Sequence, residues 1–365
     1  MKRLGISVYP EHSSLQECMD YMTLASKYGF TRVFTCLLSV KESKEEIITN
    51  FSKLCAHAHK CGMIISMDTH PSIFEKLGAT PYDLAPFKEI GVDIIRLDGH
   101  FDAMGDIAIT KNPYGILIEY NASSTLALDM MIEAGANKVN MCICSNFYPQ
   151  RYTGMGLERF KELNGHYLPL GLNDAAFVTS LEPNTHGPWE VYEGLPTLEI
   201  HRDLPIDLQL RHLNALGYNQ DFLIGNAFAS EKELKAMASV NLNTIQVRVD
   251  LADGLSDVEK EIVSFNRLSS RDDCNELVIR ASYPRVHFKG QSIEPREHGK
   301  DMFERGDVIV VNDNLEHYRG ELMIVLEPIK ASDRYNLVGT INKDEQVILD
   351  CIKAQYSFEL ITKYV

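Results

Sequence analysis

The chain has 365 residues, of which 45% are hydrophobic and 24% charged, a composition typical of a globular protein long enough for two domains. Its formal net charge of −15 disfavours nucleic acid and anionic membranes as partners, and no apolar run is long enough to span a bilayer. The eight cysteines are sparse and unpatterned, and the first residues lack the apolar core of a signal peptide. Cys142 and Cys144 alternate along one predicted strand and could bind a soft metal, but core thiols are the favoured interpretation. We therefore expect a reduced, cytoplasmic protein with no metal and no cofactor.

Apolar runs typical of buried parallel strands alternate with amphipathic segments typical of helices over the first 226 residues. The predicted strands are residues 4–9, 32–38, 63–68, 93–98, 115–121, 138–144, 167–172 and 222–226. Helices are predicted between them, among others at residues 14–28, 43–60, 123–133 and 204–216. Such β-then-α units with short links favour a closed (β/α)8 TIM barrel. An open doubly wound sheet is the competitor, but Tyr9-Pro10-Glu11-His12 offers no phosphate-binding glycines after the first strand.

The alternation stops after about residue 245, and the remaining chain predicts short strands separated by turn residues. These strands are residues 278–281, 308–311, 321–326 and 337–341. The α/β fold that we predict is therefore a TIM barrel in residues 1–250, followed by a small, mainly antiparallel β domain in residues 270–365. The boundary is expected in the polar stretch Ser269-Ser270-Arg271-Asp272-Asp273.

Acidic and polar side chains follow several predicted strands, at the end of a parallel barrel where ligands bind. They are Glu11 and His12, Asp68 to His70, Asp98 to His100, and Glu119 to Asn121. A single Asp at the start of a loop is often only a helix N-cap. As a set, these residues predict that at least two carboxylates face one pocket.

Two further segments have the composition of a ligand site. The sixth predicted strand continues into Asn146-Phe147-Tyr148-Pro149-Gln150-Arg151-Tyr152-Thr153-Gly154, with amide, aromatic and guanidinium groups. The link before the eighth strand is unusually long and carries the only tryptophan, Trp189, with acids, histidines and an arginine. An ordered loop of this composition favours a binding loop, in which Trp189 either stacks on a sugar ring or packs on the barrel rim.

Carboxylates at a barrel mouth indicate glycoside hydrolysis, which needs one protonated and one ionised carboxyl group. One alternative is a metal-dependent hydrolase or isomerase, because Asp68, His70, Asp98 and His100 repeat an Asp-x-His pattern at adjacent strand ends. The other alternative is a non-catalytic sugar-binding protein on the same scaffold.

At residues 146–154 and at Tyr192-Glu193-Gly194-Leu195-Pro196-Thr197-Leu198-Glu199-Ile200-His201-Arg202 the chain resembles the bacterial 6-phospho-N-acetylmuramidase family. Shorter matches are Asn121-Ala122-Ser123, Leu97-Asp98, Gly306-Asp307-Val308 and Tyr318-Arg319-Gly320-Glu321, so the resemblance covers nearly the whole chain. The resemblance implies a glycosidase barrel followed by a cyclophilin-like C-terminal domain. It further implies that the protein splits MurNAc-6-phosphate–GlcNAc in the cytoplasm during peptidoglycan recycling. Arg151-Tyr152 stands where other members carry Pro-Glu, so an acid role there does not transfer to Tyr152.

For this reaction we predict Asp98 and Glu199 as the acid/base pair, with Glu119 in reserve. The apolar neighbours of Glu199 are expected to raise its pKa, which suits a general acid. The anionic groups of the substrate are expected to bind Arg151, His201 and Arg202. Further substrate contacts are expected from Asp68, Asn121, Asn146, Tyr148 and Glu193. The expected partner is a phospho-sugar substrate, without nucleic acid or membrane, and a homo-oligomer is left open.

Overall fold

The computed structural model describes residues 2–38 and 43–362 of the chain, which form two compact units. Unit 1 comprises Met1–Leu210 and Tyr218–Ser239, and unit 2 comprises Arg211–Gly217 and Val240–Val365. Within the described residues, no helix is both long and apolar enough to cross a membrane.

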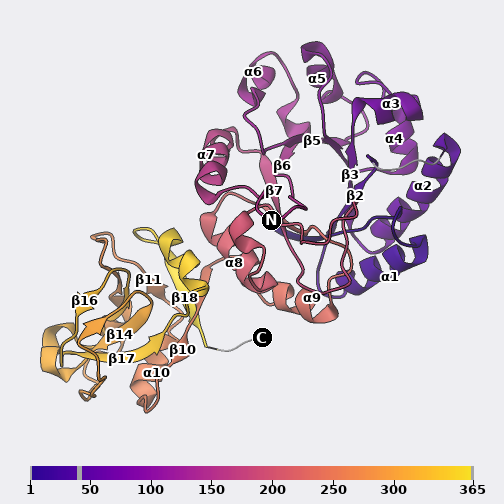
Figure 1. The fold of residues 1–365 in the computed structure, drawn as a ribbon. Coiled ribbons are helices and arrows are strands. Elements are labelled where there is room, and N and C mark those ends of the chain that lie inside the picture. Colours follow the sequence, from indigo (N-terminus) through magenta and orange to yellow (C-terminus); the bar gives the residue numbers. More distant parts are fainter. Residues whose placement is uncertain (1, 39–42, 363–365) are drawn as a thin grey trace. The chain divides into compact units, whose positions relative to one another are not determined.

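Unit 1 is built on a closed barrel of eight strands, each parallel to its neighbours, so the predicted TIM barrel is confirmed. The strands are β1 (Arg3–Ser7), β2 (Arg32–Cys36), β3 (Ile64–Thr69), β4 (Ile94–Leu97), β5 (Leu117–Asn121), β6 (Met141–Cys144), β7 (Asn173–Val178) and β8 (Asp221–Ile224). The helices that surround them in Figure 1 are α1 (Leu15–Ser26), α2 (Lys44–Lys60), α3 (Pro71–Leu77), α4 (Ala85–Ile90), α5 (Ala103–Ile109), α6 (Leu128–Glu133), α7 (Leu157–Tyr167), α8 (Ile206–Leu216) and α9 (Glu231–Ala238).

Local sequence signals fix where many of these helices begin. Ser14, Ser43 and Ser230 precede α1, α2 and α9, and each accepts a hydrogen bond from the backbone N–H of a glutamate three residues later. The glutamate side chain accepts in return from the serine backbone, which completes a capping box. Two otherwise unsatisfied donors are thereby paired at the start of each helix.

The prediction of the seventh strand is wrong. Tyr167 ends α7, residues 168–170 form the short 3-10 helix η2 (Leu168–Leu170), and β7 begins only at Asn173, after a two-residue turn. The apolar run misled the pattern because Leu168 is exposed on a helical turn, while β7 starts with two polar residues, Asn173 and Asp174. Asp174 is buried, and burial raises its pKa well above the ordinary value.

The barrel interior holds a paired charge layer beneath an apolar layer. The buried guanidinium of Arg32 donates to Glu119 and to Asp221, with N–O distances of 2.5 Å to each. An apolar cluster that includes Phe34, Phe177 and Tyr9 shares the interior. Arg32 thus supplies a positive charge to both of these buried carboxylates, which offsets part of the cost of burying them.

Unit 2 contains the predicted, mainly antiparallel β structure, which is confirmed. One sheet has the order β10-β17-β14-β15-β12, with β10 (Asp250–Leu251), β12 (Val278–Ala281), β14 (Asp307–Val311), β15 (Leu322–Val325) and β17 (Tyr335–Thr340). A second sheet joins β11 (Leu268–Ser269), β18 (Ser357–Ile361) and β9 (Ile245–Arg248), and β13 (Met302–Phe303) pairs with β16 (Ile329–Lys330). The helices α10 (Asp257–Val263) and α11 (Tyr283–His287) complete the unit.

The division between the units falls at residues 239 and 240 along the chain. Strands β9 and β11 and helix α10 therefore belong to unit 2, although they precede residue 270. The ranges 1–250 and 270–365 stay a prediction about which fragments are stable after proteolysis.

Candidate active site

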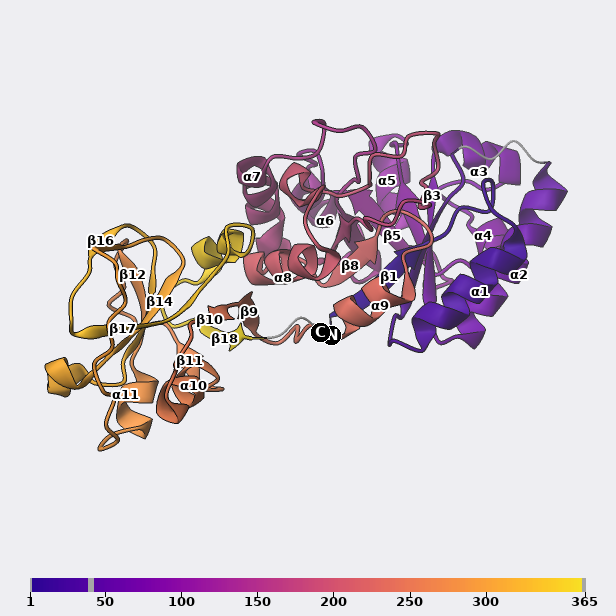
Figure 2. The same cartoon turned by 60° about the horizontal axis from the view of Figure 1, so that its bottom comes forward.

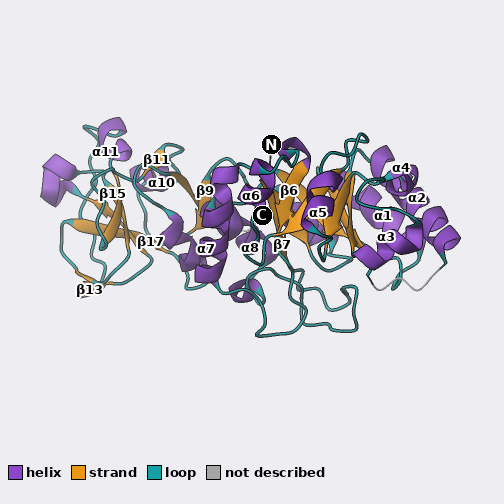
Figure 3. Cartoon of the chain, turned by 90° about the horizontal axis from the view of Figure 1, so that it is seen from above, coloured by secondary structure: helices purple, strands orange, loops and turns teal. Residues whose placement is uncertain are grey.

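The connections that follow the barrel strands gather at one end of unit 1, where long loops extend beyond the strands (Figure 2, Figure 3). Asp68 lies near the end of β3 at this mouth, opposite Arg96 of β4 in the strand register. Arg96 Nη1 donates to Asp68 Oδ1 at 2.7 Å, and both side chains are buried. Burial raises the pKa of Asp68 to about 6, against the opposing effect of Arg96. The mouth therefore holds a carboxyl group that is partly protonated near neutral pH.

Asp98 brings a second carboxyl group to the same place. It follows β4 directly, is exposed, and is anchored by its backbone N–H, which donates to the carbonyl of Thr69 at 2.8 Å. The charge of Asp98 adds to the rise in the pKa of Asp68, so the two carboxyl groups interact electrostatically. Asp68 is buried and Asp98 exposed, so the two carboxyl groups lie in different surroundings.

Arg96 links this pair to the segment after β6. Its Nη2 donates to Asn146 Oδ1, while the Asn146 backbone N–H donates to Ser123 Oγ at 2.7 Å. Asn146 O also accepts from Thr197 Oγ1 at 2.9 Å. Sequence reasoning missed Arg96, although a charged residue inside an apolar strand, two positions before Asp98, lies on the same strand face. The network holds loops from three strand ends in one arrangement.

Glu199, in the 3-10 helix η3 (Glu199–His201), lies in surroundings that differ from the expected apolar ones. Its carboxylate accepts from the N–H of Tyr152 at 2.8 Å and of Gly154 at 2.7 Å. It also accepts from Arg202 Nε and Nη2, both at 2.7 Å. The hydrogen bonds from Arg202, followed by those from the two backbone groups, lower the pKa of Glu199 to about 2. The prediction of a raised pKa is therefore wrong, because the carboxylate faces four donors and not its apolar neighbours.

Arg202, like Glu199, holds the two loops together through its hydrogen bonds. Besides Glu199, it donates to the backbone carbonyls of Glu193 at 2.9 Å, Tyr148 at 3.0 Å and Gln150 at 3.2 Å, and its side chain is buried. His201 is also fully buried. The expected contact of these two residues with a substrate anion is thus not supported, since neither presents donors at the surface. Together, Glu199 and Arg202 join residues 146–154 to residues 192–202.

A glycine permits this junction. A Cβ on Gly154 would lie 2.8 Å from the backbone N of Glu199, closer than such contacts normally come. The Glu199 carboxylate can therefore reach the Gly154 N–H only because residue 154 lacks a side chain.

Arg151 remains accessible at the edge of the site. It forms a bidentate ion pair with Asp203, at 2.7 and 3.0 Å, in which the Asp203 side chain is 72% exposed. The Arg151 backbone N–H donates to Glu193 Oε2 at 2.8 Å. Because an exposed ion pair is weakly held, the guanidinium can exchange Asp203 for a substrate anion.

The other residues predicted for the site differ in how far they are buried. Glu119 is fully buried within the barrel and paired with Arg32, so it has no access to a ligand at the mouth. Asn121 Oδ1 accepts from the Ser123 N–H at 2.9 Å and so stabilises the loop after β5. Tyr148 is partly buried, and the Glu193 side chain is exposed.

The structure does not assemble the Asp-x-His residues into a metal site. His70 caps helix α3 by accepting from the Ser72 N–H, and His100 Nδ1 lies 3.1 Å from Asp106. Across residues 2–38 and 43–362, no group of three or more His, Cys, Asp or Glu side chains is arranged to hold a metal ion. His70 and His100 thus have partners of their own within the described part of the chain.

An aromatic wall stands beside the carboxylates. Phe147 contacts Phe177 and Trp189, with ring centroids 5.0 and 6.0 Å apart. Trp189 thus packs on the rim but still exposes 43% of its surface. Trp189 therefore packs against Phe147, while the exposed part of its indole can contact a ligand. Both interpretations that the sequence left open are thus compatible with its position.

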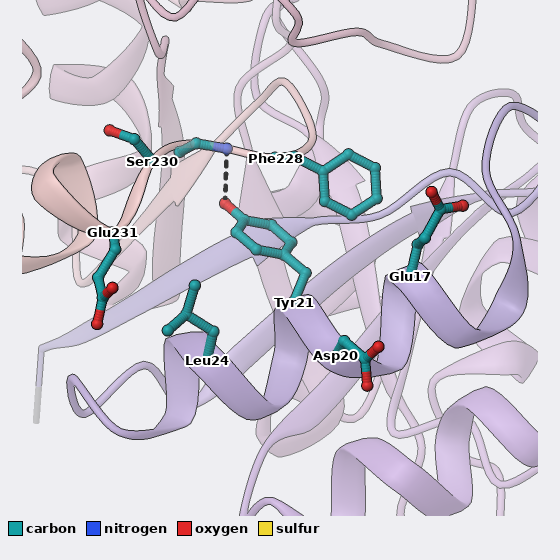
Figure 4. Close-up of a pocket in the computed structure, with 8 residues that line it drawn as sticks. Glu17, Asp20, Tyr21, Leu24, Phe228, Ser230 and Glu231 are labelled. Carbon is teal, nitrogen blue, oxygen red and sulfur yellow. Dashed lines mark hydrogen bonds between the residues drawn. The ribbon is translucent and has the colours of Figure 1, made fainter.

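A separate groove runs between α1 and the connection from β8 to α9 (Figure 4). Its floor contains Tyr21, whose hydroxyl accepts from the Ala229 N–H at 3.1 Å. Glu17 belongs to the capping box of α1, and Glu231 accepts from the Tyr28 hydroxyl at 2.5 Å. These acids already serve helix ends and packing, so we assign the groove no part in the reaction.

Comparison with known proteins agrees with this arrangement. Models described as 6-phospho-N-acetylmuramidase, N-terminal and C-terminal, match residues 4–239 and 245–361. Among solved structures, an uncharacterised protein from B. cereus is 38% identical, with 99% of each chain covered and a TM-score of 0.90. A conserved protein of unknown function from Enterococcus faecalis is 25% identical, with 99% of this chain and 96% of that chain covered and a TM-score of 0.70. The comparison with curated proteins finds no match.

Proposed function

This chain belongs to the 6-phospho-N-acetylmuramidase family and is a glycosidase, and from that membership we propose that it hydrolyses MurNAc-6-phosphate–GlcNAc. The family match extends over both units. As its place in the cell, we propose the cytoplasmic recycling of peptidoglycan, in which a phosphorylated disaccharide must be split before either sugar is reused. A small phospho-sugar is accordingly the proposed partner.

The observation that carries the chemistry is the pair of interacting carboxyl groups at the ends of β3 and β4. We assign the general acid to Asp68, in place of Glu199, because burial raises its pKa to about 6 whereas the pKa of Glu199 is about 2. Asp68 would give its proton to the glycosidic oxygen as GlcNAc leaves. Arg96, hydrogen-bonded to Asp68, would stabilise the carboxylate that this transfer creates.

Asp98 is the proposed second carboxylate. Being exposed, it can reach a ligand at the mouth, and we assign it the second carboxyl role that the reaction requires. There it either attacks the anomeric carbon, activates water, or orients the acetamido group of MurNAc for attack. Following the product anomers by NMR separates inversion from the two retaining routes.

Substrate phosphate and lactyl carboxylate need cationic donors, and Arg151 is the proposed one. It is the accessible guanidinium of the three cationic groups expected from the sequence, since His201 and Arg202 are buried. Asn146, Asn121 and Tyr148 remain proposed contacts for hydroxyl and acetamido groups.

The test is turnover of MurNAc-6-phosphate–GlcNAc and of the same disaccharide without phosphate by the purified full chain. We expect kcat/KM to be at least about 100-fold higher for the phosphorylated compound, because charge-assisted hydrogen bonds to a phosphate are among the strong ones. Equal values for both compounds would refute the proposed substrate class, though not the glycosidase activity.

A further inference from the structure

A small pocket in the loops that follow β1 and β7, at the same end of the barrel as Asp68 and Asp98, has properties that point to one half of the substrate. The cavity, of about 350 Å³, lies between the loop after β1 and the long connection between β7 and α8, and its walls include His12, Asn184, His186, Trp189 and Tyr192. Its volume is at the low end of the roughly 300–1,000 Å³ found for ligand sites. We propose that this pocket, the GlcNAc subsite, binds the uncharged N-acetylglucosamine half of the substrate, an inference that rests on the proposed function.

The pocket is formed by a loop that is held in place from several sides. His186 and Ala227 exchange backbone hydrogen bonds of 3.2 and 2.7 Å. His12 Nε2 donates to the carbonyl of Pro188 at 2.9 Å, which fixes its tautomer, and His186 Nε2 lies 3.0 Å from Ser13 Oγ. A pocket whose walls are fixed before binding loses little conformational entropy when a ligand enters.

The charge of the lining favours a neutral ligand. No Lys or Arg is among the residues of the described chain that line the cavity. Burial, with a smaller contribution from His12, lowers the pKa of His186, so this imidazole is neutral near pH 7 and acts by hydrogen bonding. The doubly anionic muramyl 6-phosphate half would find no counter-charge here, whereas Arg96 and Arg151 lie on the other elements of the mouth.

The remaining lining chemistry suits an N-acetylated sugar ring. Trp189 and Tyr192 expose 43% and 71% of their surfaces, and aromatic faces pack against the C–H groups of a sugar. The Asn184 amide and the two imidazoles can pair with hydroxyl and acetamido groups, which need both donors and acceptors.

The pocket also lies within reach of the reacting bond. Trp189 packs on Phe147, which directly follows Asn146, and Asn146 accepts from the Arg96 that holds Asp68. These contacts link one wall of the pocket to the proposed general acid, and on this basis we place the leaving GlcNAc in the pocket.

The first test uses the fact that Trp189 is the only tryptophan of the chain. Its fluorescence is followed while the methyl β-glycoside of GlcNAc is titrated into the full protein. We expect a saturable change, with a Kd that rises about tenfold in Tyr192→Ala, since one well-packed aromatic contact commonly has that effect. Tyr82→Ala is the matched control, because Tyr82 is also 71% exposed but does not line the cavity.

Three results of this titration would overturn the subsite. They are the absence of a saturable change, equal Kd values for the two tyrosine variants, and a tighter, competing response to muramyl 6-phosphate.

Kinetics separate this inference from the proposed function. Tyr192→Ala should lower kcat/KM for MurNAc-6-phosphate–GlcNAc about tenfold, but leave it unchanged for MurNAc-6-phosphate fluoride, whose leaving group is too small to reach the pocket. An equal loss with both substrates would overturn the subsite while keeping the glycosidase. If the wild-type protein cleaves neither substrate, the proposed function fails; a Tyr192-dependent response to the GlcNAc glycoside would then still support the pocket as a GlcNAc-binding site.

Discussion

Replacing Glu199 by Gln tests whether this residue braces the loops or performs the chemistry. The lowering of its pKa from 4.5 to about 2 corresponds to about 3 kcal/mol of preference for the charged form. Since its side chain is 25% exposed, solvent screening reduces the contribution to stability to about 1–2 kcal/mol. For a unit of this size each kcal/mol shifts Tm by roughly 2–4 °C, so we expect Tm to fall by about 2–8 °C.

The pH dependence of this loss has a definite sign. A carboxyl group whose pKa is depressed on folding stabilises the protein above its unfolded pKa, and the stabilisation disappears as the pH falls through the folded value. The difference in Tm between wild type and Glu199→Gln should therefore be constant from pH 8 to about pH 5. It should shrink as the pH falls below 4.5 towards 2.

The assay is thermal unfolding followed by circular dichroism, combined with kcat and KM for the disaccharide. Glu190→Gln is the control, because Glu190 is exposed in the same long connection and a surface change of this kind usually stays within about 0.5 kcal/mol. If Glu199 only holds the two loops together, we expect Glu199→Gln to have a lower Tm, a higher KM and a kcat reduced by less than about tenfold. An unchanged Tm with kcat reduced by 10² or more would refute this reasoning and return the acid role to Glu199.

Three further predictions concern residues in and under the mouth. Asp68→Asn should lower kcat by about 10² or more and abolish the fall in kcat/KM that a general acid of pKa about 6 causes above that pH; a variant that keeps this limb in its pH–rate profile contradicts the assignment. Arg151→Ala should raise KM at least about tenfold for the phosphorylated disaccharide but not for the unphosphorylated one, and an equal rise with both would exclude a phosphate contact. Glu119→Gln should destabilise unit 1 by about 3 kcal/mol in denaturant unfolding, because it leaves part of the buried Arg32 charge unpaired. The kcat per folded molecule should be nearly unchanged, and a large loss of kcat without destabilisation would make Glu119 catalytic.

Periodicity and strand-end chemistry were sufficient to predict the barrel and the position of its mouth. The apolar runs that end at Asp68 and Asp98 are long and flanked by clear turns, so local pattern and tertiary structure agree there. β7 was missed because it begins with two polar residues: Asn173 is exposed, and Asp174 is buried only by tertiary packing, which no local window contains.

The role of Glu199 could not be read from its neighbours in the sequence. Its pKa depends on backbone donors at Tyr152 and Gly154, more than 40 positions away, and these become neighbours only when two loops meet. Arg96 is a different case, because its position on the same strand face as Asp98 was visible in the sequence and was not used. Hydrogen bonds between residues far apart in the chain could thus not be predicted from the sequence, whereas the alternation of side chains along a strand could be.

The proposed mechanism assigns glycoside hydrolysis to the carboxyl groups at the ends of β3 and β4. It is tested most directly by the rate of GlcNAc release from MurNAc-6-phosphate–GlcNAc by the full chain and by its Asp98→Asn variant. We expect turnover by the wild type and a kcat lower by about 10² or more in the variant, with Tm unchanged because Asp98 is exposed. Retention of most of the wild-type rate by Asp98→Asn would contradict it.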